Sequence, residues 1–99
     1  MEINKIQDGA KLTMAISGCL DTTTSPELQA VLDDSPSGVT ELNFDFASLD
    51  YISSAGLRVL LVANKKMASV GGKMTIQNVN PSVKEVLEMT GFLDIFTLV

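Results

Sequence analysis

Histidine is absent from this chain of 99 residues. Its absence excludes the commonest general base, the Ser-His-Asp and Cys-His arrangements of nucleophilic catalysis, and a histidine phosphoacceptor. Cysteine occurs once, at Cys19, so an internal disulfide cannot form and zinc has no second thiol or imidazole ligand. We expect Cys19 to be a small buried hydrophobic residue. The sequence favours a protein that is not an enzyme and needs no metal or other cofactor.

Long apolar runs and positive charge are also scarce. No apolar stretch approaches the roughly 20 residues that span a bilayer, and the N-terminal sequence MEINKIQDG lacks the basic and apolar regions of a signal peptide. Seven Lys and Arg residues stand against twelve Asp and Glu residues, which gives a net charge of -5. Nucleic-acid-binding domains carry a basic face instead. The sequence therefore predicts a cytoplasmic protein that binds neither a membrane nor nucleic acid.

The hydrophobic residues that are present, 45% of the chain, follow strand and helix periodicities. They suffice for the core of one domain over residues 1–99. Leu12, Met14 and Ile16, for example, alternate with polar residues as in a half-buried strand. The predicted order is strands at 2–7 and 11–17, a helix at 26–34, a strand at 39–46, a helix at 55–70, a strand at 73–79, a helix at 81–90 and a final extended segment at 92–99.

Turn and cap residues mark the boundaries of these elements. Residues 8–9 form the turn of an N-terminal antiparallel hairpin, which Gly18 ends. Ser25 is suited to cap the first helix, with Pro26 at its first position, and residues 35–38 stop it. Strands joined through helices lie parallel, with right-handed crossovers. The sequence thus predicts a small α/β domain with a mixed, mostly parallel sheet, an N-terminal antiparallel hairpin and packed helices.

Polar side chains gather in the loops at the carboxyl ends of the predicted strands. In open α/β sheets these ends meet the amino ends of helices, where sites tend to form. We expect Asp21, Asp45, Ser53 and Ser54 to lie along this edge, which the loop at 78–80 also reaches. For the two aspartates the alternative is structural, because Asp21 can cap a loop and Asp45 can face solvent from its strand.

Ser54 has two possible roles at the start of the predicted helix. Its hydroxyl can cap the helix, which stabilises a protein by about 1 kcal/mol. A phosphoryl group on the same oxygen would meet unpaired backbone N–H groups at the positive end of the helix dipole. Ser53 can be the cap instead, because helix boundaries read from sequence err by a few residues.

Small residues follow the two serines. Ala55 and Gly56 would let a partner's backbone or a phosphate approach closely, and they would equally permit tight packing of the helix on the sheet. Arg58, one turn further on, is either a surface side chain or a contact for an acidic partner.

A magnesium-dependent receiver domain, with Asp45 as phosphoacceptor, is an alternative class. Residues 33–34 would supply its acidic pair, but they fall near the end of a predicted helix and not in a loop after the first strand. That placement argues against a receiver.

Four stretches together resemble the STAS domain of bacterial anti-sigma factor antagonists. The likeness covers nearly the whole chain, and its most specific part is the similarity of the second stretch to the family's Asp-Ser-Ser-Gly-Leu phosphorylation motif. The stretches are SGCLDTTTSPEL, LNFDFASLDYISSAGLRVLL, GGKMTIQNVNPSVKEVLEMTGF and LDIFTLV.

The resemblance implies roles for individual residues. Ser54 matches the serine that a partner kinase phosphorylates, Gly56 matches the motif glycine, and Asp21 matches an acidic residue beside that serine. Two positions depart from the pattern, because Ser53 replaces a usual aspartate and Ala55 replaces a usual serine or threonine. Many members also continue into a further helix beyond the position of Val99, so we expect either part of the usual partner surface or the cover of one sheet edge to be missing.

The function that the resemblance implies is that of an anti-sigma factor antagonist. Unmodified, such a protein binds an anti-sigma factor that is also a serine kinase, and phosphorylation of the serine breaks the complex until a cognate phosphatase resets it. ATP belongs to the partner. An alternative is a constitutive interaction module of another partner-switching pathway, which the uncharged Ser53 favours. The residues expected to contact the partner are Asp21, Thr22, Ser53, Ala55, Gly56 and Arg58.

Overall fold

The computed structural model describes residues 1–34 and 38–99, and it confirms a small α/β fold with a mixed sheet. Of the predicted helix stop at 35–38, residues 35–37 lie outside the described residues. The elements are β1 (Glu2–Asp8), β2 (Lys11–Leu20), α1 (Ser25–Asp33), β3 (Glu41–Asp45), β4 (Leu49–Ile52), α2 (Ser54–Ser69), β5 (Lys73–Gln77), α3 (Pro81–Met89), a 3-10 turn at Phe92–Asp94 and β6 (Thr97–Leu98).

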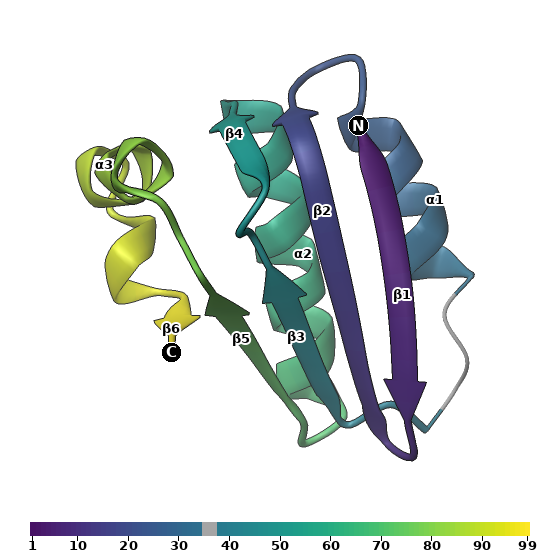
Figure 1. Cartoon of the computed structure of the whole chain (residues 1–99). Helices are drawn as coiled ribbons and strands as arrows, with labels where there is room; N and C mark the ends of the chain where they lie inside the picture. The colour runs from purple at the N-terminus through teal and green to yellow at the C-terminus, as the bar shows by residue number, and fades with distance from the viewer. Residues whose placement is uncertain (35–37) are drawn as a thin grey trace.

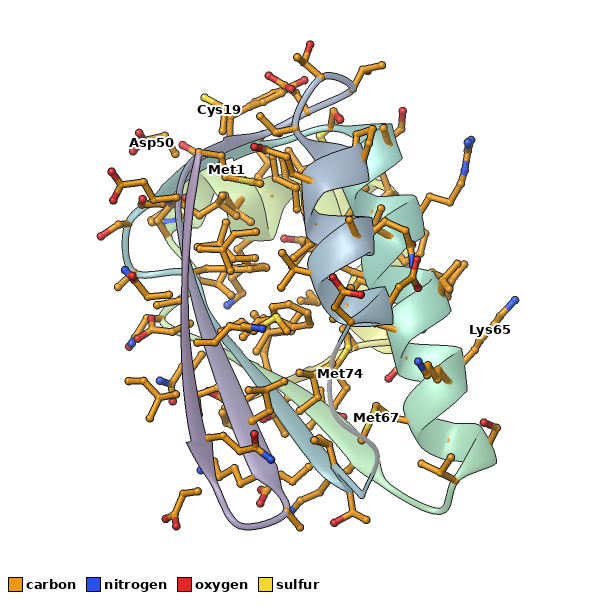
Figure 2. All side chains as sticks on the ribbon, turned by 90° about the vertical axis from the view of Figure 1, so that its right-hand side faces the viewer. Met1, Cys19, Asp50, Lys65, Met67 and Met74 are labelled. Atoms are coloured by element: carbon orange, nitrogen blue, oxygen red, sulfur yellow. The ribbon has the colours of Figure 1, made fainter. Side chains whose placement is uncertain are left out.

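The sheet has the strand order β1-β2-β3-β5-β6 (Figure 1). β1 pairs antiparallel with β2, whereas the other pairs are parallel, as the sequence predicted. Figure 2 shows α1 and α2 side by side on one face of this sheet. α3 lies at the opposite end of the molecule from α1, beyond β5 (Figure 1). Among the described helices, none is long and apolar enough to cross a membrane.

A separate strand, β4, was missed by the sequence prediction. β2 is ten residues long, and its first half pairs with β3 while its last residues pair with β4. The antiparallel pairing with β1 stops at Ser17, so Gly18 does end the hairpin, but β2 itself continues past Gly18 to Leu20. Gly18 has φ +87° at a register shift within β2, and its N–H donates to the Ser48 carbonyl at 3.0 Å. Glycine suits this position because other residues rarely adopt a positive φ.

The hydrophobic core lies between the sheet and the helices α1 and α2, and Val83 and Leu87 of α3 extend it. Leu12, Met14 and Ile16 of β2 are buried in it, as their alternation predicted. Phe44 of β3 is also buried in the core, as is Phe46, which follows the last residue of β3. Twenty-one buried hydrophobic residues form this one cluster within the described part of the chain.

Two predictions about single residues are corrected by the structure. Cys19 is exposed and not buried, because the alternation of β2 continues to its end: Leu20 lies in phase with the buried residues 12, 14 and 16, and Cys19 falls on the opposite face. Ser25 does not cap α1: Thr24 is the N-cap, and the Ser25 hydroxyl donates to the Asp21 carbonyl at 2.5 Å.

α2 lies close to the sheet at Gly56. A Cβ atom placed on Gly56 would lie 2.7 Å from Cγ of Leu20 and 3.0 Å from Cγ1 of Ile52, both buried residues at the ends of β2 and β4. The requirement for glycine is thus explained by helix-to-sheet packing, which was one of the two alternatives for Gly56.

We predict that Gly56→Ala destabilises the fold by about 1–3 kcal/mol, since overpacking outweighs the gain of up to about 1 kcal/mol in helix propensity. Urea unfolding of both proteins measures the change. Ser69→Ala, at an exposed position of the same helix, is the control and should change the free energy of unfolding by less than about 0.5 kcal/mol. An unchanged or higher stability of Gly56→Ala would contradict the packing explanation.

Candidate functional site at the start of α2

The candidate site forms where the end of β2 meets the start of α2. Leu20 pairs with Ile52, and the Ser53 N–H then donates to the Leu20 carbonyl at 2.9 Å. Asp21 follows Leu20 directly in the chain. The pairing therefore brings the Asp21 loop beside Ser53 and Ser54, although these segments are about thirty residues apart in sequence.

Ser53, and not Ser54, is the N-cap of α2. Its backbone is extended (φ -100°, ψ 174°), and its Oγ accepts from the Gly56 N–H at 3.4 Å, a long hydrogen bond. Ser54 is the first helical residue, and its exposed side chain makes no hydrogen bond to any described residue. The two serines therefore differ in role: Ser53 caps the N-terminus of α2, and the hydroxyl of Ser54 remains available for modification.

Asp21 organises the loop between β2 and α1. One carboxylate oxygen, Oδ1, accepts from the N–H groups of Thr23 at 2.9 Å and Thr24 at 3.0 Å, and also from the Thr24 hydroxyl. The Thr24 backbone N–H, with help from Thr23 and the hydroxyl, lowers the pKa of Asp21 below its usual value. Asp21 is therefore an ionised carboxylate held in a turn, as the structural interpretation predicted.

A shallow pocket of about 210 Å³ lies between the first turns of α1 and α2. The structure brings together at this pocket the predicted residues Thr22, Ala55 and Arg58, of which Thr22 and Arg58 are exposed. The α1 side of the pocket was not predicted from the sequence. Its residues carry no chemical motif, although the Asp-x-x-Thr spacing of the preceding turn was a local signal for it. The pocket is lined by Thr22, Ser25, Pro26, Gln29, Ala55, Arg58 and Val59.

Asp45 does not join the other predicted site residues. It pairs with Ala15 of β2, five residues before Leu20, which places it roughly 16 Å away along the strand. Its Oδ1 accepts from the side-chain amide of Asn78 and from the Ala47 N–H, each at 3.0 Å. The Asn78 amide is the main cause of the lowered pKa of Asp45, and the Ala47 N–H adds to it. The prediction that these groups share one edge is wrong for Asp45.

The same geometry bears on the receiver alternative. Asp45 binds neighbouring amides and is only partly exposed, and residues 1–34 and 38–99 contain no group of three His, Cys, Asp or Glu residues that could hold a metal ion. The hydrogen bonds of Asp45 therefore stabilise the loop after β3, and its carboxylate does not belong to a magnesium site within the described residues.

Comparisons with known proteins agree on the family to which the chain belongs. The STAS domain model matches residues 2–99. The chain is 37% identical over 86 residues to BtrV of Bordetella bronchiseptica, assigned as an anti-sigma factor antagonist, covering 86% of this chain and 74% of that protein. It is 29% identical over 89 residues to the anti-sigma F factor antagonist of Paenibacillus polymyxa, covering 88% of this chain and 76% of that one.

Solved structures show the same fold. The anti-sigma factor antagonist SpoIIAA in its unphosphorylated form superimposes with a TM-score of 0.78 and 16% identity, over 99% of this chain and 87% of the other. The phosphorylated form of Bacillus SpoIIAA gives 0.77 and 17%, over 99% and 91%. The chain belongs to the STAS domain family, among the anti-sigma factor antagonists. These are regulators and not enzymes, as the sequence predicted.

We predict that the two serines differ in their effect on stability. Ser53→Ala removes the cap of α2 and should cost about 0.5–1 kcal/mol, near the low end for a cap because the hydrogen bond is long. Ser54→Ala removes no hydrogen bond and should stay within about 0.5 kcal/mol of the wild type. Urea unfolding tests both, and a larger loss in Ser54→Ala would assign the cap to Ser54.

The lowered pKa of Asp45 gives a further prediction. Asn78→Gly removes the amide and suits the positive φ of 59°, so the Asp45 pKa should rise while that of Asp21 stays unchanged. A carboxyl with a lowered folded-state pKa stabilises the fold above its unfolded pKa of about 3.9, and the stabilisation is lost as the pH falls through the folded pKa. The variant should thus lose stability relative to the wild type at neutral pH and match it more closely in acid.

Carboxyl NMR titrations of Asp45 and Asp21 measure the two pKa values directly. Thr24→Val is the reciprocal control and should raise the pKa of Asp21 alone. A titration of Asp45 that is the same in Asn78→Gly and wild type would show that Asn78 is not the cause.

Proposed function

We propose that this chain binds an anti-sigma factor that is also a serine kinase, and that phosphorylation of Ser54 by that kinase ends the binding. A cognate phosphatase would restore the unmodified form. The observation that carries the proposal is the exposed hydroxyl of Ser54 at the first position of α2, which makes no hydrogen bond to a residue that the structure describes.

The position of Ser54 allows phosphate to be added without loss of the fold. Ser53 already supplies the cap, so modification of Ser54 breaks no hydrogen bond to a described residue. The new dianion would lie at the positive end of the α2 dipole, where the first backbone N–H groups of a helix lack intrahelical partners. Such a position favours negative charge by a few tenths to about 1 kcal/mol for each unit charge.

In the transfer step, the Ser54 Oγ forms a bond to the γ-phosphorus of ATP, the bond from that phosphorus to the bridging oxygen breaks, and ADP leaves. The hydroxyl proton needs an acceptor. This chain has no histidine, and the nearby Asp21 carboxylate is held by the amides of its own turn. The general base, the ATP and its metal ion therefore belong to the kinase, and this chain supplies the nucleophile and the surface that positions it.

The same surface explains how phosphate would dissociate the complex. Ala55 leaves little side-chain bulk next to Ser54, so a partner can approach the helix start closely, and Thr22 and Arg58 flank the approach. A phosphate adds about two negative charges there. Like charges or unpaired charges at a closely packed interface cost several kcal/mol, enough to separate two proteins.

The comparisons support this proposal by the names of the relatives. Two matched proteins are described as antagonists of anti-sigma factors, and SpoIIAA has been solved in unphosphorylated and phosphorylated forms with this fold. A constitutive interaction module is the second candidate. The uncharged cap at Ser53 favours it, because a family member with aspartate there has a stronger negative field for a kinase to recognise.

We predict that Ser54→Ala binds the anti-sigma factor as the wild type does, whereas Ser54→Asp binds at least roughly tenfold more weakly. Ser82→Asp is the matched control, because Ser82 is an exposed residue in the first turn of α3 and receives the same charge. It should leave the affinity unchanged.

The anti-sigma factor would be identified by mass spectrometry after co-purification with the tagged chain from its own cells, then purified for isothermal titration calorimetry. Incubation of the pair with ATP, followed by phosphopeptide mapping, identifies the modified residue. Phosphate on Ser54 that abolishes binding supports the switch. Equal affinities of Ser54→Ala and Ser54→Asp would overturn it and favour the constitutive module.

A further inference from the structure

The exposed side of α2 carries an ordered row of side chains that starts at the proposed phosphorylation site. Positions 54, 58, 61, 62 and 65 fall within one face of a helix with 3.6 residues per turn. Ser54, Arg58, Val62 and Lys65 are exposed on this face, and Leu61 is half-buried at its border. Figure 2 shows Lys65 projecting from α2 away from the sheet. We call Ser54, Arg58, Leu61, Val62 and Lys65 the α2 ridge.

The ridge is positively charged in an acidic protein. α2 contains three of the seven Lys and Arg residues, at Arg58, Lys65 and Lys66, and none of the twelve Asp and Glu residues. The rest of the chain therefore has four basic residues against twelve acidic ones. No acidic side chain from the described residues forms a salt bridge with any of these three, whereas Lys73 pairs with Glu41 at 3.4 Å.

The helix dipole accounts for the position of one of these three cations and not for that of Arg58. Lys66 lies in the last turn, where the negative end of the helix dipole favours a cation. Arg58 lies one turn from the start, where the dipole does not favour a cation, and no described acidic residue compensates it. Neither the helix dipole nor a described acidic residue stabilises the charge of Arg58, so its guanidinium is available to another molecule.

The middle of the ridge is apolar. Val62 is 48% exposed, between Arg58 and Lys65, and Leu61 lies beside it. From Ser54 to Lys65 the ridge is about 17 Å long, at 1.5 Å per residue. Its aliphatic side chains are flanked by cations, and such a row fits a protein surface that has a central apolar patch and an acidic rim. The net charge of -5 disfavours an anionic lipid surface or nucleic acid as the occupant.

We propose that the α2 ridge docks onto an acidic face of the anti-sigma factor, and that phosphate on Ser54 weakens this contact by lowering the positive charge of the ridge. This inference rests on the proposed function. The phosphate adds about -1.5 to -2 to a helix that carries +3. Arg58 is four residues from Ser54, a spacing at which opposite charges pair on a helix, so the phosphate also competes with the partner for the Arg58 guanidinium.

The test is the double variant Arg58→Gln/Lys65→Gln, measured against the anti-sigma factor recovered with the wild-type chain. Lys11→Gln/Lys84→Gln is the control: it makes the same change in net charge at two exposed positions off the ridge. We expect the ridge variant to bind roughly tenfold more weakly and to show a smaller dependence of affinity on salt between 50 and 300 mM. The control should bind within about threefold of the wild type, and both variants should melt as the wild type does.

The outcomes separate this inference from the proposed function. If both double variants bind equally well, with equal salt dependence, while Ser54→Asp still loses the partner, the ridge inference is wrong and the proposed function stands. If the wild-type chain recovers no anti-sigma factor, both are wrong. If the wild type self-associates in sedimentation equilibrium and the ridge variant does not, the occupant is a second copy of this chain, and the inference of an anti-sigma factor surface is overturned.

Discussion

The contact on which the site depends is the seating of Gly56 against Leu20 and Ile52. Because Gly56 has no Cβ, the first turn of α2 can lie directly on the ends of two parallel strands. The hydrogen bond from the Ser53 N–H to the Leu20 carbonyl fixes the same point. A tight hydrophobic contact beneath the helix start thus determines which hydroxyl caps the helix and which one faces solvent.

The long strand β2 sets the distance between the two acidic groups that sequence reasoning had joined. β3 pairs with its first half and β4 with its end, so the chain makes a further step along the sheet before α2 begins. Asp45 remains at the earlier step, where Asn78 and the Ala47 N–H bind its carboxylate. Asp21 follows the end of β2 and therefore lies beside Ser53, at the end of β4. The staggered strands therefore separate a structural aspartate from the candidate switch.

Charge links the fold to the proposed mechanism. The acidic residues are distributed over the rest of the chain, whereas α2 is basic and begins with an exposed serine. A single phosphate would remove most of the positive charge of this helix without disturbing the cap or the packing beneath it. The change in surface charge and the stability of the fold are thus largely independent, which is the property that a reversible binding switch requires.

Local pattern determined most of the fold: the alternation in β2, the start of α3 at Pro81, and the Ser-Ser-Ala-Gly start of α2 could all be read from the sequence. These features depend on neighbouring residues, so sequence suffices for them. The choice of Ser53 as cap and the separation of Asp45 from Ser54 were decided by the tertiary structure. Each depends on a helix-to-sheet contact or a pairing between distant segments, and neither leaves a local signal in the chain.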